Sequence, residues 1–326
     1  MASAVDVTIH ASQFPENVRR DLAESLRTRR VKHKFHYDSV KQTQKWLALH
    51  QKYSPTRTDA DSQRIYEESF GAATNAVSAA TVHVIGLGCG GGQKDTRLLR
   101  RLKAGGKRIS YTPCDVSTAM VLTARRTALA VLPEHRCSPL VLDLATAGDI
   151  SAVLKSRITD RGSRIITFFG MIPNFEPEPI LPGLTSVVGP KDRLLFSANL
   201  APGVDYDAGM KTILPQYDNG LTRDWLMTFL LDLGGEWRDG DLRFTVEAGR
   251  LGLKRVVARF HFSRTRRIEI EGEQFVFRRG ENIRLFFSYR YTPEHVCKIL
   301  GRYKLKICRQ WISKSEQEGV FLVCRR

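Results

Sequence analysis

Short apolar runs alternate with amphipathic segments between about residues 80 and 200. The apolar runs predict strands at 81–87, 108–114, 139–143, 164–169 and 192–198, and the intervening segments predict helices at 95–104, 117–131, 147–156 and 178–187. Strands and helices that alternate at this spacing are joined by right-handed crossovers. The pattern therefore predicts an α/β fold with a mostly parallel sheet and helices on both of its faces.

The pattern differs on either side of this central part. Residues 1–60 and 206–233 both predict helices, the first of them with a turn near Ser54. Short strands are predicted at 243–247, 254–263, 267–271, 274–278 and 283–289, followed by a helix at 293–300 and strands near 303–309 and 319–324. Because consecutive short strands favour antiparallel pairing, we expect an antiparallel unit and then an antiparallel pair at the edge of the parallel sheet.

A glycine-rich segment, Gly86–Gly92, follows the first strand of the predicted sheet. Glycine permits a sharp turn and a close approach of the backbone to a ligand, and the N-terminus of the next helix favours anions and hydrogen-bond acceptors. Asp115 ends the next predicted strand, where a carboxylate can accept hydrogen bonds from both hydroxyls of a ribose. The sequence therefore predicts a site for a nucleoside-containing cofactor.

Two carboxylates help to distinguish the possible cofactors. The GxGxxG spacing of Gly86–Gly91 fits the dinucleotide fingerprint, but Asp115 comes later than an NAD-type acid, and Gln93–Asp95 separate the turn from its predicted helix. Asp143 follows the third predicted strand, where the adenine amino group of S-adenosylmethionine would lie, although a helix N-cap is the alternative for this residue. Asp115 and Asp143 together favour S-adenosylmethionine, and an NAD-dependent dehydrogenase is a weaker alternative.

The charge of the chain adds a second clue. The 326 residues carry a formal net charge of +17, and the basic excess is spread over several segments. Such a field attracts RNA or other anions, or serves solubility alone. The sequence contains no membrane-spanning apolar run and no signal-peptide layout at its N-terminus. Six scattered cysteines without a CxxC pair favour free thiols, so we expect a cytoplasmic protein with no metal site.

Short motifs spread over nearly the whole chain point to a family. They are Phe35–Asp38, Lys52–Thr58, Gly88–Gly90 with Lys94 and Thr96–Leu99, Tyr111–Ser117, Phe169–Pro177, Tyr217–Asn219, Gly280–Ile283 and Ser288–Tyr291. In this order they resemble the histidine-specific methyltransferase family, which makes trimethylhistidine on the way to ergothioneine. A fungal relative in that family methylates dimethylallyltryptophan.

The resemblance implies a fold and a division into domains. It implies a class I methyltransferase core with a Rossmann-like, mostly parallel sheet, formed by residues 62–200 and 287–326. A second, α+β lid domain would be built from two segments, residues 1–61 and 201–286, and would close over the substrate. Closure of this kind excludes water from the reacting centre.

The resemblance also implies which residues form the site. S-adenosylmethionine would be bound by Gly86, Gly88, Lys94, Asp115, Val116, Asp143 and Leu144. The substrate would be contacted by Tyr37, Tyr53, Asn174, Tyr217, Phe286 and Ser288. Of these, Asn174 and Tyr217 would hold the amino-acid group and act as the catalytic residues. The alternative for each tyrosine is a core position with a satisfied hydroxyl.

The chain departs from the family at the positions that select the acceptor. Phe286 stands where histidine-methylating members have the acidic residue that recognises the imidazole, and Gly86 stands where the family has an acid before the turn. Loss of a hydrogen-bonding partner should abolish selectivity for the imidazole ring. Phe286 and Phe260 suggest an apolar or aromatic acceptor, whereas Arg259 or Arg284 could meet an anionic group.

The sequence therefore predicts an S-adenosylmethionine-dependent enzyme that methylates the nitrogen of a small amino-acid-like or amine substrate other than histidine. One alternative is a methyltransferase of RNA or protein that uses the basic surface. Another is a non-catalytic partner subunit that binds the cofactor without turnover. Neither a metal nor a membrane is expected as a partner.

Overall fold

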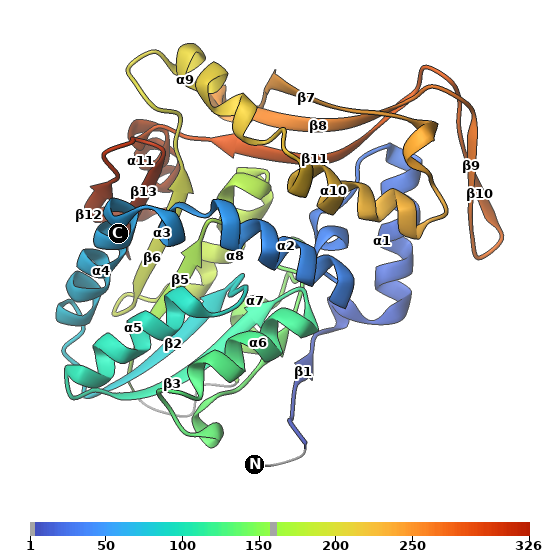
Figure 1. Cartoon of the computed structure of the whole chain (residues 1–326). Helices are drawn as coiled ribbons and strands as arrows, with labels where there is room; N and C mark the ends of the chain where they lie inside the picture. The colour runs from blue at the N-terminus through green and yellow to red at the C-terminus, as the bar shows by residue number, and fades with distance from the viewer. Residues whose placement is uncertain (1–3, 157–161) are drawn as a thin grey trace.

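The computed structural model describes residues 4–156 and 162–326, and an eight-stranded sheet runs through its centre (Figure 1). Across the sheet the strands are β1 (Thr8–Ile9), β4 (Leu140–Val141), β3 (Arg108–Asp115), β2 (Thr81–Leu87), β5 (Ser163–Phe169), β6 (Arg193–Asn199), β13 (Glu318–Arg325) and β12 (Leu305–Ile312). The pairs from β1 to β6 are parallel, whereas β13 is antiparallel to both β6 and β12. The predicted parallel sheet with an antiparallel pair at its edge is confirmed.

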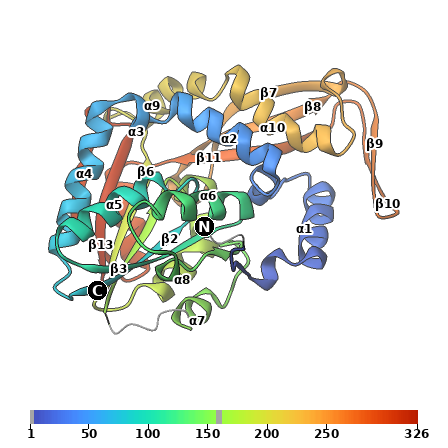
Figure 2. The ribbon, with the colours of Figure 1, turned by 60° about the horizontal axis from the view of Figure 1, so that its bottom comes forward.

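Helices cover both faces of this sheet, as expected (Figures 1 and 2). On one face lie α4 (Ala60–Asn75), α5 (Gln93–Ala104) and α6 (Thr118–Ala128), and on the other lie α7 (Ile150–Lys155), α8 (Pro177–Val187) and α11 (Pro293–Arg302). Successive side chains of a strand point to opposite faces. Val82 and Val84 accordingly pack under the first group of helices, and Ile85 and Leu87 pack under the second.

A second, antiparallel sheet lies beyond the main sheet, across the top of Figure 1. It contains β7 (Gly240–Ala248), β8 (Lys254–Phe262) and β11 (Asn282–Arg290), with β8 in the middle and β11 at one edge. The hairpin of β9 (Arg266–Ile270) and β10 (Glu273–Phe277) extends from it. Side chains of α1 (Pro15–Thr28), α2 (Val40–Tyr53) and α10 (Gly220–Asp232) pack against this sheet. The predicted antiparallel unit is confirmed.

The predicted division into two domains stays a prediction, but two elements bear on it. β1 places part of the N-terminal segment in the main sheet, where it pairs with β4. β11 continues to Arg290, so this single strand crosses the expected division between residues 286 and 287. The two-residue β1 was not predicted, because so short a strand carries no periodic pattern.

The helical pattern predicted over 206–233 is confirmed, but it forms two helices because the chain breaks near its middle. α9 (Tyr206–Ile213) is followed by the short turn Leu214–Gln216, and α10 begins at Gly220 with Asn219 as its N-cap. Pro215 has no N–H to donate, and its ring is incompatible with a continuous helix. The break leaves Tyr217 outside either helix and on the wall of the central cavity.

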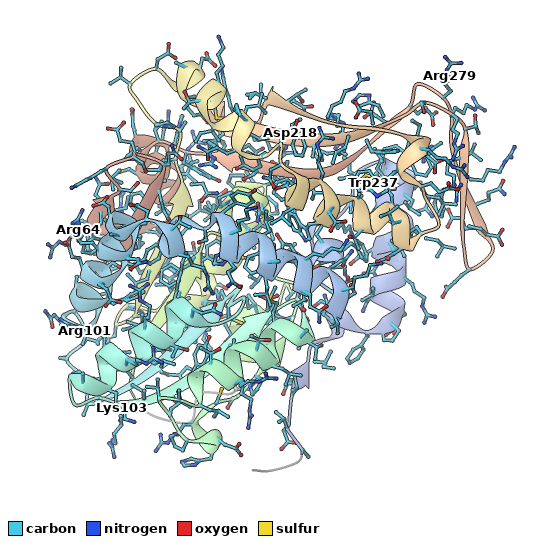
Figure 3. All side chains as sticks on the ribbon, in the orientation of Figure 1. Arg64, Arg101, Lys103, Asp218, Trp237 and Arg279 are labelled. Carbon is cyan, nitrogen blue, oxygen red and sulfur yellow. The ribbon has the colours of Figure 1, made fainter. Side chains whose placement is uncertain are left out.

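Basic side chains lie on opposite sides of the molecule. Arg64 on α4 and Arg101 and Lys103 on α5 lie on one side of the molecule, and Arg279, just after β10, lies on the opposite side (Figure 3). Over residues 4–156 and 162–326, no helix is long and apolar enough to cross a membrane.

Candidate functional site

A cavity of about 1560 Å³ lies between the carboxyl ends of the parallel strands and the edge strand β11. Ligand pockets are typically about 300–1,000 Å³, so this cavity has room for a cofactor and a second molecule. From the predicted site it brings together Gly88, Lys94, Asp115, Val116, Asp143, Leu144, Tyr37, Tyr53, Asn174, Tyr217, Phe286 and Ser288. Gly86 lies in β2 and is not part of the lining.

The glycine-rich turn is shaped by backbone conformations that favour glycine. Gly88 has a φ of +67°, and a Cβ there would lie 2.3 Å from the Met171 Sδ atom. Gly92 has a φ of +73° and is the N-cap of α5, which begins at Gln93. The expectation that Gln93–Asp95 separate the turn from the helix is therefore wrong, because the left-handed Gly92 directs the chain straight into α5.

Asp115 lies next to this turn at the end of β3. Its Oδ2 accepts a hydrogen bond from the Gly90 N–H at 3.0 Å, and its Oδ1 accepts one from the Ser117 N–H at 3.1 Å. Each oxygen retains a lone pair for a further donor, as a ribose diol requires. Burial raises the pKa of Asp115 to about 6, so the side chain is ionised at neutral pH. Burial and then the charge of Asp115 raise the pKa of Tyr37, which remains a neutral phenol.

Asp143 and Leu144 form the next part of the wall. Asp143 Oδ1 accepts a hydrogen bond from the Ala145 N–H at 2.9 Å, and its Oδ2 lies 3.7 Å from Lys34 Nζ. The N-cap of α7 is Asp149, so the alternative that Asp143 caps a helix is wrong. A carboxylate beside the apolar Leu144 suits a flat base with an amino group at its edge.

Lys94 holds a positive charge at the start of α5. Its ammonium donates a hydrogen bond to the Tyr66 hydroxyl at 2.8 Å and lies 3.8 Å from Glu318 Oε1. Burial lowers the pKa of Lys94, and Glu318 opposes that change. The contacts with α4 and β13 fix the ammonium on the cavity wall, where it can meet an anionic group of a cofactor.

Asp95 is a carboxylate that the sequence analysis missed. It is 2% exposed and accepts hydrogen bonds from the Tyr111 hydroxyl at 2.6 Å and the Thr167 hydroxyl at 2.7 Å. A Cβ on Gly86 would lie 2.1 Å from Asp95 Oδ2. The space beside residue 86, where the family has an acid, is thus filled by a carboxylate from α5. The sequence offered one signal for this role of Asp95, which is that position 86 lacks an acid and an acid follows nine residues later.

We expect Gly86→Ala to destabilise the protein by about 2–3 kcal/mol, because the added methyl group must displace a buried, hydrogen-bonded carboxylate. Gly183→Ala is the matched control, since a Cβ there would have its nearest neighbour at 3.9 Å and would favour helix α8. Denaturant unfolding of both variants measures the difference. Equal midpoints for the two variants would contradict the proposed packing of Asp95 against Gly86.

The opposite side of the cavity carries a polar cluster around Tyr217. The Tyr217 hydroxyl donates to Ser288 Oγ at 2.9 Å and accepts hydrogen bonds from Arg290 Nη2 at 3.0 Å and Nε at 3.2 Å. Arg290 is 7% exposed and donates to the Leu200 carbonyl, but it forms no ion pair with any residue that the structure describes. The Asn174 side-chain amide forms no hydrogen bond within the described part of the chain. Such a cluster can bind a carboxylate and an amine.

Arg290 is a second residue that the sequence analysis did not select. Arg290 belongs to the motif Ser288–Tyr291, but it did not stand out because basic residues are common along this chain. Its burial without a carboxylate partner is a property of the folded protein. A buried arginine usually has such a partner, so a cavity-lining one without it is a candidate anion ligand.

Aromatic rings form the wall beside this cluster. The Phe286 ring lies 5.0 Å from the His33 ring, 5.6 Å from Trp225 and 6.4 Å from Tyr217. Tyr37 packs against Trp225 and Trp46, and Tyr53 is 46% exposed at the edge of the cavity. The cavity wall around Phe286, where the resemblance implies an imidazole-binding acid in histidine-methylating members, is therefore apolar in this chain.

Arg259 and Arg284, the two arginines that could meet an anionic group of the acceptor, have different positions. Arg284 lines the cavity, whereas Arg259 is paired with Glu247 at 2.9 Å and does not line it. Phe260, expected near the acceptor, is 1% exposed within the core beneath the antiparallel sheet. Of these three residues, Arg284 alone has access to a ligand in the cavity.

Comparison with known protein families identifies the family of the chain. Residues 15–325 match the model of the family described as histidine-specific, S-adenosylmethionine-dependent methyltransferase. The chain belongs to this family. It is therefore an S-adenosylmethionine-dependent methyltransferase, and its central sheet and flanking helices form a Rossmann-like class I core. The glycine turn, Lys94, Asp115 and Asp143 fit the cofactor, since they offer a close backbone approach, a cation and two carboxylates to one cavity.

No curated protein matches the sequence. Among solved structures, the chain is similar to magnesium protoporphyrin IX methyltransferase from Synechocystis PCC 6803, with 13% identity over 89% of this chain and 97% of that one and a TM-score of 0.44. It is also similar to a putative methyltransferase from Thermobifida fusca YX, with 11% identity over 91% and 94% of the two chains and a TM-score of 0.46. A third is the CcbJ methyltransferase from Streptomyces caelestis, with 12% identity over 80% and 95% and a TM-score of 0.39.

Proposed function

We propose that this methyltransferase acts on the nitrogen of a small amino-acid-like or amine acceptor other than histidine. The proposal rests on one observation, which is that a polar cluster and an apolar surface lie side by side in one cavity. Arg290, Tyr217 and Asn174 offer a cation, a hydroxyl and a free amide, and Phe286 offers an apolar surface beside them.

The polar cluster supports an acceptor with an amino-acid group. The Arg290 guanidinium can form charge-assisted hydrogen bonds with a carboxylate, which are about twice as strong as neutral ones. The Asn174 amide can then orient the amine through its oxygen. Tyr217 lies between the groups that would bind the carboxylate and the amine. Its hydroxyl is held by Arg290 and Ser288, so it cannot rotate freely.

Phe286 supports the exclusion of histidine. An imidazole ring placed against Phe286 would bury a ring nitrogen without the acid that other family members supply. An unpaired buried polar group costs about 1–3 kcal/mol, which disfavours histidine relative to an acceptor with an apolar body. Trp225 and His33 extend the aromatic surface on which such a body can pack.

When bound, S-adenosylmethionine supplies a methyl group on a positively charged sulfur. The protein has to align the acceptor nitrogen with that group at about 3 Å and keep water away. The contacts of Arg290, Tyr217 and Asn174 would fix the acceptor. The aromatic wall of Tyr37, Trp46 and Trp225 would exclude water.

Incubation with methyl-labelled S-adenosylmethionine tests this proposal. One sample receives a deproteinised, nucleic-acid-free metabolite extract, and a parallel sample receives RNA. We expect label in a small molecule of the extract and none in RNA. Label in RNA alone would contradict the proposal and favour the basic surface as the binding site. Absence of label in both samples, with cofactor binding confirmed, would also contradict it and favour a protein acceptor or a non-catalytic partner.

A further inference from the structure

We propose that the acceptor carries a second anionic group, remote from its amine, and that Arg284 and Arg30 bind this group at the far end of the cavity. The inference rests on the proposed function, because it assigns a further part of the acceptor to the same cavity. Both arginines line that cavity, together with Val31 and Lys32 from the same N-terminal segment.

The backbone brings Arg30 and Arg284 side by side. The two residues form an isolated parallel bridge, in which the Val31 N–H donates to the Arg284 carbonyl at 2.9 Å and the Arg284 N–H donates to the Arg29 carbonyl at 2.9 Å. Paired backbones lie about 4.7–4.9 Å apart, so the two side chains begin close together. Like charges at this spacing repel each other, so an anion held between the two side chains would stabilise the pair.

Neither guanidinium has an ion-pair partner among residues 4–156 and 162–326. In the part of the chain that the structure describes, Arg30 and Arg284 form no ion pair and their side chains form no hydrogen bond. Burial and then the charges of Arg255 and Arg30 lower the pKa of Arg284 to about 10, with Glu176 acting against them. The pKa thus reports the same excess of positive charge that the geometry shows.

The neighbouring charged groups are already paired. Glu176 accepts hydrogen bonds from Arg255 at 2.7 Å and from the Tyr289 hydroxyl at 2.6 Å. Lys32 forms ion pairs with Asp21 at 2.7 Å and Glu24 at 2.6 Å. The surplus charge at this end of the cavity therefore belongs to Arg30 and Arg284.

A continuous row of rings connects these arginines with the amino-acid cluster. The Arg284 guanidinium lies 4.9 Å from the centre of the Phe287 ring, which lies 5.0 Å from the His33 ring. His33 in turn contacts Phe286, which contacts Tyr217. The row suits an apolar or aromatic spacer between the two ends of an acceptor.

A bulge in β11 makes this arrangement possible. The register between β11 and β8 shifts between Arg284 and Phe286, and β11 is an edge strand. Bulges next to active sites re-aim side chains, and this one lets residues from both faces of the strand reach the cavity. Arg284 and Ser288 pair with Arg259 and Val256 of β8, which are three positions apart, so their backbones are separated by roughly 10 Å along the strand. A small amino acid would not span that separation, whereas an elongated one would.

Equilibrium binding to the protein saturated with S-adenosylhomocysteine tests the inference. The probes are biphenylalanine, its para-carboxylate and its para-phosphonate, which share one apolar body and differ in the distal group. We expect the better of the two anionic probes to bind about tenfold more tightly than biphenylalanine, since a hydrogen bond to a charged group contributes that order of affinity. Arg284→Gln should reduce this ratio to about one without weakening the binding of S-adenosylhomocysteine.

Arg259→Gln is the matched control, because Arg259 is the β8 partner of Arg284 and carries the same charge, but faces Glu247 outside the cavity. It should leave the preference for the anionic probes unchanged. A ratio near one in the unmodified protein, or a preference that survives Arg284→Gln combined with Arg30→Gln, would overturn the inference.

A fourth probe, biphenyl dicarboxylate, separates this inference from the proposed function because it has no amine. Binding of this probe that depends on Arg284, with no binding of any amino-acid probe, would support the anion site and contradict an amino-acid acceptor. Binding of biphenylalanine without preference for the anionic probes would contradict the anion site and leave the amino-acid acceptor supported. Failure of all four probes to bind would contradict both.

Discussion

Asp115→Asn is expected to weaken binding of S-adenosylhomocysteine roughly hundredfold, because two hydrogen bonds to a charged carboxylate would be lost or weakened. Asp115 offers both oxygens to the cavity while the Gly90 and Ser117 N–H groups hold it in place. An asparagine keeps one oxygen but presents an NH₂ group to a donor. Isothermal titration measures the loss directly.

Asp241→Asn is the matched control, since Asp241 is exposed, pairs with Arg243 and lies outside the cavity. The Asp241→Asn variant should bind S-adenosylhomocysteine with the same affinity as the unmodified protein. Equal affinities of the Asp115 and Asp241 variants would contradict the assignment of Asp115 to the ribose.

The same carboxylate predicts a pH dependence. Because burial raises the pKa of Asp115 to about 6, the ionised form that accepts hydrogen bonds disappears as the pH falls through that value. The dissociation constant should therefore be nearly constant above about pH 7 and rise about tenfold between pH 7 and pH 5. The Asp115→Asn variant should lack this rise, and a rise of equal size in that variant would assign the titration to another group.

Tyr217→Phe is expected to lower methyl transfer to the labelled small molecule roughly 10- to 100-fold while leaving cofactor binding within twofold of the unmodified protein. The change removes the hydroxyl that Arg290 and Ser288 share, so the buried guanidinium loses a partner and the acceptor loses a hydrogen bond. Initial rates at saturating cofactor, together with titration of S-adenosylhomocysteine, separate the two effects.

Tyr206→Phe provides the comparison for this variant. The Tyr206 hydroxyl donates to the Arg290 carbonyl at 2.6 Å and accepts from the Lys254 N–H, but Tyr206 does not line the cavity. Loss of the Tyr206 hydroxyl should lower the stability of the protein more than it lowers the rate of methyl transfer. Equal losses of cofactor binding and transfer in Tyr217→Phe would contradict the role of Tyr217 at the acceptor.

The sequence predicted the main sheet well because its strands are buried on both faces. Runs such as Val82–Leu87 are apolar except for His83, and glycines or acids lie at their ends, so the pattern marks where these strands stop. The predicted cofactor half of the site follows from the same feature, since Gly88, Asp115 and Asp143 lie at or just beyond the carboxyl ends of parallel strands and therefore share one edge of the sheet.

The acceptor half depends on contacts between distant segments, which periodicity does not reveal. Arg290 and Tyr217 are 73 positions apart, and Arg30 and Arg284 are joined by a bridge that no local pattern marks. The break at Pro215 was the one local signal, and an otherwise helical pattern on both sides concealed it. Asp95 was missed for a similar reason, because its partners Tyr111 and Thr167 lie on β3 and β5, the strands on either side of β2.

The central claim is that the methyl group goes to the nitrogen of an acceptor that is not histidine. Mass and fragmentation spectra of the labelled product test it most directly, with free histidine offered in a parallel reaction. The account predicts an added methyl group on an amine nitrogen of a compound other than histidine, and no product from histidine. A methylated histidine, or a methyl group on oxygen or carbon, would contradict it.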